Sequence, residues 1–236
     1  MALLQSAARN RLLRRLSPET YAQLQPHLQL ITTELRQVLV APNVPIQRLY
    51  FPESGFSSMT TGGPRGQSEI GLVGPEGLVG ATPVLLGSDR GPYEHMIQSP
   101  GAMLAIEAPI LLRATDANAA LRRLLLRSVQ VQMVQTAQTA FVNATYQVEA
   151  RLARWLLMCH DRTEGDELAL THEFLSLMLG VQRTSVTLAL QALEGRQLIR
   201  ARRGRITILN RPALLGVAGD SYGVPEAEHA RLIEEA

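Results

Sequence analysis

Residues 171–194 read THEFLSLMLGVQRTSVTLALQALE, and this stretch predicts two short helices joined by a tight turn. Thr171 can cap the first helix, Glu173 lies in its first turn, and Gly180 can adopt the left-handed conformation that redirects the chain. The expected buried faces are Phe174, Leu175, Met178 and Leu179 in the first helix, and Val186, Ala189, Leu190 and Leu193 in the second, which ends at Gly195. Together these features predict a helix–turn–helix.

The first turn of the second helix carries polar, hydrogen-bonding side chains and no acid. A turn of this kind enters the major groove of DNA, where arginine reaches guanine O6 and N7 and glutamine reaches adenine. We therefore predict a base-reading set that consists of Gln182, Arg183, Thr184 and Thr187.

Residues 198–202 and 205–209 alternate about a tight Arg203-Gly204 turn, which predicts a β-hairpin, the wing of a winged helix. Between Gly180 and Arg211 there are seven arginines and one acid, Glu194. Arginine side chains bind the phosphates of DNA; these contacts position the protein on the duplex and do not read the base sequence. The predicted phosphate contacts are Thr171, Ser185, Arg200, Arg202, Arg203 and Arg205. The alternative is a helical hairpin with a solvated basic ribbon.

Glycine and proline divide the rest of the chain. They recur every few residues from Pro42 to Pro109, and neither occurs between Ile110 and Glu164. We expect short helices in residues 3–35, then the short strands of a β-sandwich or small β-roll, then helices. The expected strands are 38–40, 46–51, 56–60, 68–72, 95–98 and 103–106.

A long helix is predicted over residues 116–144, followed by a second helix over 148–160. One narrow stripe of the long helix has apolar and small residues at 3,4-spacing with glutamines beside it, which favours a contact between two copies of the chain. The residues of this predicted dimer seam are Leu126, Val129, Met133, Thr136 and Ala140. A single long core helix is the alternative.

Composition excludes several classes of protein. The 236 residues are 46% hydrophobic and 19% charged, which argues against wholesale disorder, and the net charge of +2 means that any nucleic-acid face must be local. Cys159 is alone, which excludes an intrachain disulfide, a multi-cysteine zinc site and a four-cysteine iron–sulfur cluster. With no secretory signal and no apolar stretch of about 20 residues, we expect a cytoplasmic protein without a membrane partner.

The segment from Leu170 to Thr187, with Leu198-Ile199 and Gly204 to Ile208, resembles the DNA-binding domain of the Crp/Fnr transcription regulators. Residues 149–157 are similar to the helix that leads into that domain. Residues 50–55 and 71–80 are similar to strands of the family's cyclic-nucleotide-binding-like β-roll. The resemblance covers roughly residues 10–215 and is strongest in the last third.

The resemblance implies an α+β fold with an N-terminal, jelly-roll-like β-roll, a long dimerisation helix and a C-terminal winged helix–turn–helix. The corresponding divisions are a sensor domain at 1–115, the dimerisation helix at 116–144, the DNA-binding domain at 145–215 and a tail at 216–236. It implies a transcriptional regulator that binds a two-fold-related operator in double-stranded DNA as a homodimer. RNA polymerase is a further candidate partner.

The recognition helix departs from the best-known members, which carry Arg then Glu at its start and another Arg one turn later. Arg183 matches the first Arg, whereas Thr184 stands in place of Glu and Leu188 in place of the later Arg. Glutamate selects cytosine and threonine does not, so the family's base preference cannot be transferred to this chain.

Residues 71–80 contain glycine at every third position, and the possible effector pocket comprises Gly74, Glu76, Gly77 and Arg90. In cyclic-nucleotide-binding relatives a Gly-Glu pair and a later Arg-Ser/Thr pair hold the ribose and the phosphate. Here the later segment, 92–96, contains Glu94 and no arginine, which disfavours a cyclic phosphate. We expect an unidentified effector or none, with turn geometry as the reason for the glycines and a cyclic-nucleotide-responsive regulator as the alternative.

We expect no cofactor, although haem stays open because His27, His95 or Cys159 could ligate iron. No catalytic activity is expected. Cys159, His160 and Asp161 are consecutive, and helix residues one apart point about 100° apart, so they cannot align as a triad. The remaining alternative is a cupin-like metal enzyme. Such an enzyme needs closely spaced histidine ligands, whereas the five histidines here are scattered along the chain.

Overall fold

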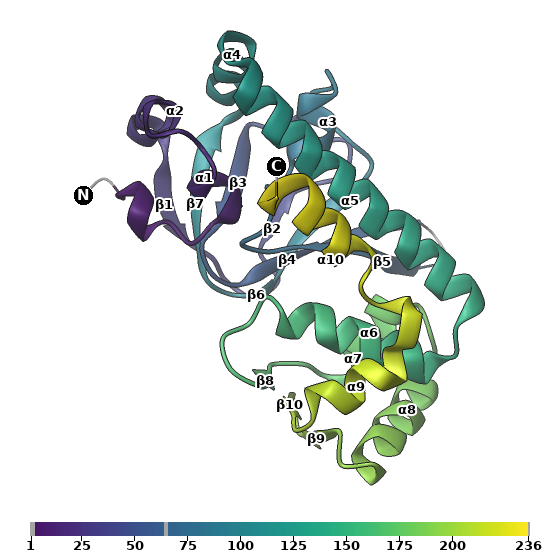
Figure 1. Ribbon diagram of the computed structural model, residues 1–236. Helices are drawn as coiled ribbons and strands as arrows, with labels where there is room; N and C mark the ends of the chain where they lie inside the picture. Colours follow the sequence, from purple (N-terminus) through teal and green to yellow (C-terminus); the bar gives the residue numbers. More distant parts are fainter. Residues whose placement is uncertain (1–2, 64–65, 236) are drawn as a thin grey trace. The chain divides into compact units, whose positions relative to one another are not determined.

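The computed structural model describes residues 3–63 and 66–235, which form two compact units (Figure 1). The first unit comprises Met1–Met59, Val73–Met133 and Glu228–Ala236. The second comprises Thr60–Leu72 and Val134–Ala227. Within the described residues, no helix combines the length and apolar character that a membrane crossing requires.

The first unit opens with four short helical elements: η1 (Gln5–Ala7), α1 (Arg11–Arg14), α2 (Pro18–Leu24) and η2 (Gln25–His27). The Asn10 side chain accepts hydrogen bonds from the amides of Leu12 and Leu13, and Ser17 caps α2 by accepting from the Thr20 amide. The expectation of short helices through residue 35 is wrong for the last part, where Gln29–Thr32 form strand β1. Pairing with a distant strand, β7, decides the conformation of this segment.

Each of the six strands expected from the sequence is present, with ends that shift by up to three residues. Strands β1, β7 (Ala102–Glu107) and β3 (Arg48–Pro52) form one antiparallel sheet in the order β1-β7-β3. A second sheet has the order β2-β6-β4-β5, with bounds Val38–Val40, Glu94–Ser99, Phe56–Gly63 and Gly66–Val73. Two sheets of short strands agree with the predicted β-roll.

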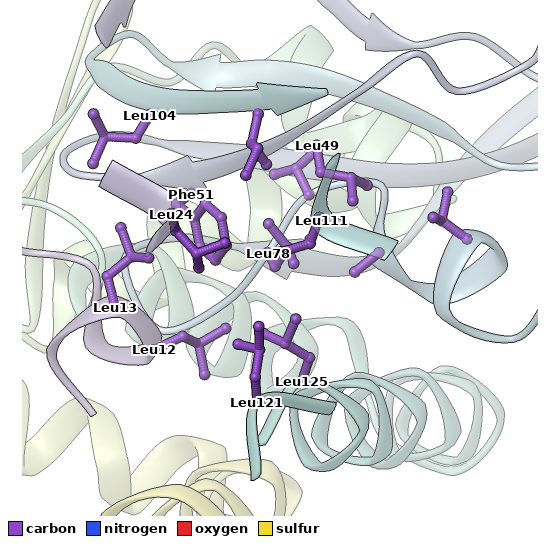
Figure 2. Packing of buried hydrophobic residues seen from close by; sticks show 14 of the residues in the cluster. Leu12, Leu13, Leu24, Leu49, Phe51, Leu78, Leu104, Leu111, Leu121 and Leu125 are labelled. Carbon is purple, nitrogen blue, oxygen red and sulfur yellow. The ribbon is translucent and has the colours of Figure 1, made fainter. Parts of the chain in front are cut away.

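The core of the first unit joins the N-terminal helices to the strands and to two later helices (Figure 2). Its largest buried side chains are contributed by segments far apart in sequence, including Leu12, Leu13, Leu49, Phe51, Leu104, Leu111, Leu121 and Leu125. Ile233, close to the end of the chain, is also buried in this core. The short helix α3 (Ala81–Leu85) contributes Ala81 and Val84.

The predicted helix 116–144 is two helices, α4 (Ala108–Ala117) and α5 (Ala119–Thr145), so the expected start at residue 116 is wrong. Asn118 is extended, and its side-chain oxygen accepts hydrogen bonds from the amides of Ala120 and Leu121. This cap stops α4 and starts α5, because asparagine satisfies the free amides of a helix start. The expected end at residue 144 is one residue short.

The second unit is centred on α6 (Val148–His160), which packs against α7 (His172–Leu179), α8 (Arg183–Gly195) and α9 (Arg211–Ala218). A three-stranded sheet has the order β8-β10-β9, with bounds Glu167–Leu168, Arg205–Ile208 and Ile199–Arg202. The Trp155 indole donates to the Glu69 carboxylate over 2.6 Å, which ties α6 to β5.

The segment that follows the winged helix, predicted as a tail at 216–236, contains three helical elements after α9. After α9 come η3 (Gly219–Ser221), α10 (Val224–His229) and the π-helical η4 (Ala230–Glu234). In the second unit, the Tyr222 hydroxyl donates to Asp161, and Arg211 donates to the other oxygen of the same carboxylate. Burial and this hydrogen bond both raise the pKa of Tyr222, which therefore stays protonated as a donor.

Candidate nucleic-acid interface

The helix–turn–helix is built as its sequence predicts. The Thr171 hydroxyl accepts from the Phe174 amide over 3.1 Å and begins α7. Gly180 has φ +61° and ψ +38°, and the Gly180 and Val181 amides donate back to carbonyls of α7. A side chain at such a φ is strained, so glycine here fixes the angle at which α8 leaves the turn.

The buried face of α8 consists of the four residues that the sequence predicts, Val186, Ala189, Leu190 and Leu193. This packing leaves the first turn directed outward. Gln182, Arg183 and Thr184 are exposed, and Ser185 and Thr187 are half-buried. Among the described residues, no hydrogen bond or ion pair is recorded for the side chains of Gln182 and Arg183.

Thr187 is more constrained than the other predicted base-reading residues. Its hydroxyl donates to the Arg183 carbonyl over 3.1 Å and lies 3.2 Å from His172 Nδ1. Thr187, on α8, therefore faces the first residue of α7 and links the two helices. Leu188, which the predicted site omits, is 67% exposed on α8. This large apolar side chain is thus exposed beside the predicted base-reading residues. The sequence could have indicated its exposure, because position 188 does not belong to the 3,4-spaced positions that form the buried face.

The wing is a two-stranded hairpin in which Arg205 pairs with Arg202 and Thr207 pairs with Arg200. Gly204 has a φ of +74°, which allows the tight turn after Arg203. Ile199, Ile206 and Ile208 face inward, whereas the four arginines predicted to contact phosphates are exposed: Arg200, Arg202, Arg203 and Arg205.

The charge of the wing is largely uncompensated. Arg205 forms an ion pair with Glu167 at 3.2 Å in which both side chains are exposed, and such pairs contribute little to stability. Within the chain segments that the structure describes, Arg200, Arg202 and Arg203 have no recorded ion pair. Three neighbouring guanidinium groups repel one another. A bound anion would offset this repulsion.

Glu194, the one acid in this basic stretch, positions the wing. Its Oε1 accepts a hydrogen bond from the Ala201 amide over 2.6 Å, so the end of α8 is attached to β9. The carboxylate is therefore directed at the backbone and not at the arginines. In the sequence, Glu194 stands out only as the one acid in a basic run, a few residues before the wing.

The residues of the possible effector pocket make local contacts. Glu76 Oε1 accepts from the Gly74 amide over 3.1 Å, and the Gly77 amide donates to the Gly74 carbonyl. The Arg90 guanidinium donates twice to the neighbouring Asp89 carboxylate, at 2.8 and 2.9 Å. Both charged groups thus have partners within one or two residues of themselves.

The residues considered for haem are placed differently from one another. His27 is exposed, and Cys159 is fully buried in α6. His95 is buried in β6, and its Nδ1 has no hydrogen-bond partner in the described part of the chain. Among the described residues there is no group of three or more His, Cys, Asp or Glu side chains that could hold a metal ion.

Four of the five predicted dimer-seam residues are at least partly accessible along α5. Met133 is 56% exposed and Leu126 is 37% exposed, Ala140 is exposed, and Thr136 is half-buried. Val129 is buried within its own chain.

Comparisons with known proteins agree with this architecture. Residues 150–217 match the Crp-like helix-turn-helix domain. The fold is similar to FixK2 from Bradyrhizobium japonicum (TM-score 0.69, 15% identity, 81% of this chain and 98% of that chain). It is also similar to a Crp/Fnr family regulator from Eubacterium rectale (TM-score 0.68, 17% identity, 88% of this chain and 97% of that chain).

A third similar structure is the c-di-GMP responsive global regulator CLP of Xanthomonas campestris (TM-score 0.65, 18% identity, 81% of this chain and 99% of that chain). No curated protein sequence matches the chain. The architecture is thus that of a winged helix–turn–helix protein with a β-roll. More specifically, the chain carries a Crp-like helix–turn–helix domain and has the fold of the Crp/Fnr transcriptional regulators.

Proposed function

We propose that this protein is a DNA-binding transcriptional regulator of the Crp/Fnr type that binds a two-fold-related operator as a homodimer. The observation that carries this proposal is the outward-facing first turn of α8, with Arg183 free of partners, in a domain that also has an exposed arginine wing. A free arginine at the start of a recognition helix suits the O6 and N7 atoms of guanine. The wing arginines suit the flanking phosphates.

Leu188 adds a second kind of base contact to this proposal. Its exposed side chain lies one turn after Thr184 on the same helix. An apolar side chain in the major groove packs against the methyl group of thymine. The operator half-site therefore contains a guanine for Arg183, with a thymine at the position that Leu188 reaches.

The dimer is supported by the accessible stripe on α5. Leu126 and Met133 are large apolar side chains with substantial exposure, seven residues apart on one helix. Such a pair, with Ala140 a further seven residues along, is typical of a helix that packs against its copy. Two copies place two α8 helices about 34 Å apart when they bind adjacent major grooves of the same DNA.

No cyclic nucleotide is assigned to residues 74–77 and Arg90. The contact between Arg90 and Asp89 would have to break before the guanidinium could receive a phosphate. Titration calorimetry with cyclic AMP is expected to give no saturable heat, and tight binding would overturn this assignment. We also propose that the protein has no catalytic activity and needs no cofactor.

The test of the proposed function is selection of bound fragments from genomic DNA, followed by affinity measurements on the selected site. Arg183→Ala is expected to relax discrimination at one base pair in each half-site by about 1–3 kcal/mol. Arg196→Ala is the matched control, because Arg196 lies at the far end of α8 and pairs with Glu149. Unchanged selectivity in Arg183→Ala would contradict the assignment of α8 as the recognition helix.

A further inference from the structure

A basic pocket lies in the first unit between the N-terminal half of α5 and the C-terminal segment that begins with Glu228. Its volume is about 550 Å³. The α5 wall includes Arg122, Arg123, Leu126 and Arg127, and the opposite wall includes Glu228 and Arg231. The predicted function uses only Leu126 among these residues.

The pocket has an excess of positive charge. Four arginines line it against one carboxylate, and Arg231 engages that carboxylate, on Glu228, through two hydrogen bonds of 2.7 and 2.8 Å. Arg127 donates to the Leu232 carbonyl over 3.3 Å, which is an uncharged partner. Arg123 is exposed and has no ion pair or hydrogen bond recorded in the described ranges.

Arg122 has two partners near the end of α4, and the first is neutral: its Nε donates to the Thr115 carbonyl over 3.2 Å. Its ion pair with Asp116 is 3.0 Å long, with side chains that are 51% and 77% exposed. An exposed pair of this kind contributes little, so a multiply charged anion can take the place of Asp116. Arg122, Arg123 and Arg127 therefore offer three guanidinium groups within two turns of one helix.

The volume and lining of the pocket indicate the class of ligand. A volume of about 550 Å³ lies within the range of pockets for small organic molecules. Guanidinium forks match phosphate oxygens in pairs, and the Leu126 and Leu232 side chains supply an apolar surface. We propose that this pocket binds a small molecule that carries a diphosphate group on an organic moiety, with Arg122, Arg123 and Arg127 on the phosphates.

This site gives the C-terminal segment a role beyond closing the core. Ile233 is buried, Arg11 pairs with Glu234 at 3.1 Å, and the Arg15 guanidinium donates to the Glu234 carbonyl. These contacts hold the segment that forms the second wall of the pocket. The ligand bridges this segment and α5, which lie about one hundred residues apart in sequence.

A link to dimerisation follows, and it alone rests on the proposed function. Leu126 belongs both to the pocket and to the predicted dimer seam. A ligand that contacts Leu126 affects the packing of a second α5, and by reciprocity the dimer affects the affinity for the ligand.

The test is titration calorimetry of the full chain with inorganic pyrophosphate and with adenosine 5′-diphosphate. Saturable binding is expected at one ligand per chain, with tighter binding of adenosine 5′-diphosphate because its nucleoside contacts the apolar surface. Arg123→Ala is expected to weaken binding about tenfold, because it removes one charge-assisted contact. The affinity of Arg123→Lys is expected to lie between that of the unaltered chain and that of Arg123→Ala. Arg113→Ala is the matched control, since Arg113 is exposed on α4 outside the pocket.

Two results would overturn the inference: no saturable heat with either probe at millimolar concentration, or an equal loss in Arg113→Ala and Arg123→Ala. Folding of each variant is checked by circular dichroism, and DNA binding is measured on the same preparations. If the unaltered chain binds the diphosphate but no DNA, the proposed function is contradicted and the pocket stands. The reverse result would reject the pocket alone.

Discussion

Replacing the buried His95 with glutamine should remove a large part of the acid sensitivity of the first unit. Burial lowers the pKa of His95 from 6.5 to about 4. Because the folded-state pKa lies below the unfolded one, the unfolded chain takes up the proton first. The stability that neutral His95 contributes is therefore present above pH 6.5 and is lost as the pH falls toward 4.

The magnitude follows from the two pKa values. Each pKa unit corresponds to about 1.4 kcal/mol, so the full effect between pH 6.5 and pH 4 approaches about 3 kcal/mol. Between pH 7.5 and pH 5 the loss is about 2 kcal/mol, because the unfolded imidazole is then almost fully protonated and the folded one is not. This is a substantial fraction of the stability of an ordinary domain.

The assay is urea unfolding followed by far-ultraviolet circular dichroism at constant ionic strength over this pH range. Fluorescence is unsuitable, because the one tryptophan, Trp155, lies in the second unit. Burial also lowers the pKa of His229. His229 therefore contributes an acid-induced loss of stability in both the wild type and His95→Gln. The difference in slope between wild type and His95→Gln isolates His95.

His27→Gln is the matched control, since His27 is exposed on η2. A slope in His95→Gln equal to that of the wild type would refute the reasoning, because the buried imidazole would then not be the group that titrates. Loss of the folded signal at pH 7.5 is a separate outcome, which the midpoint of urea unfolding at that pH detects.

Arg203→Ala should weaken binding to all DNA sequences alike and reduce the slope of log affinity against log salt by about 1, measured by fluorescence anisotropy; a selective loss at one base would contradict its role on phosphate. Leu126→Asp combined with Met133→Asp should give a monomer in sedimentation equilibrium, because two carboxylates on the exposed stripe oppose packing of a second α5. The control is Leu112→Asp, since Leu112 is also exposed but lies on α4. A dimer that persists in the double variant would place the interface elsewhere. Glu194→Ala should destabilise the winged helix by about 1–3 kcal/mol, since the Ala201 amide loses a charged acceptor, and protease digestion should then cut first near β9; unchanged protection would show that the wing does not depend on this bond.

The winged helix could be predicted almost residue by residue because its elements are specified locally. Gly180 and Gly204 each occupy a backbone conformation that favours glycine, and the apolar spacing of α8 admits one buried face. The predicted end of α8 at Gly195 is also confirmed, although Gly195 itself is helical and the residue with a positive φ is Gln197, two positions later. The strands of the β-roll were located by the turn residues between them, although their ends were less certain.

The features that the sequence did not predict depend on contacts between distant segments. Gln29–Thr32 carry no strong strand pattern and become a strand through pairing with β7. In α6, the eight residues from 152 to 159 are all buried because other elements surround the helix, so amphipathic spacing could not predict the buried Arg154. Arg154 donates to Thr139 across 3.1 Å, and burial lowers its pKa. The pocket beside α5 was missed since its second wall comes from the far end of the chain.

Under the proposed function, the composition of α8 limits how the protein discriminates between DNA sequences. A dimer with one Arg183 contact in each half-site gains about 2–6 kcal/mol of discrimination from guanine. Specific DNA-binding proteins typically reach about 4–10 kcal/mol over non-specific sites. In the proposed complex, we expect the difference to come from Gln182, from Leu188 on thymine methyl groups, and from the energy needed to deform the DNA between the half-sites. Since Thr184 does not select cytosine as a glutamate does, we expect the spacer sequence to influence affinity even where no side chain touches it. Changing only the spacer, with both half-sites intact, should therefore change affinity at constant salt; equal affinity for stiff and flexible spacers would assign all discrimination to α8.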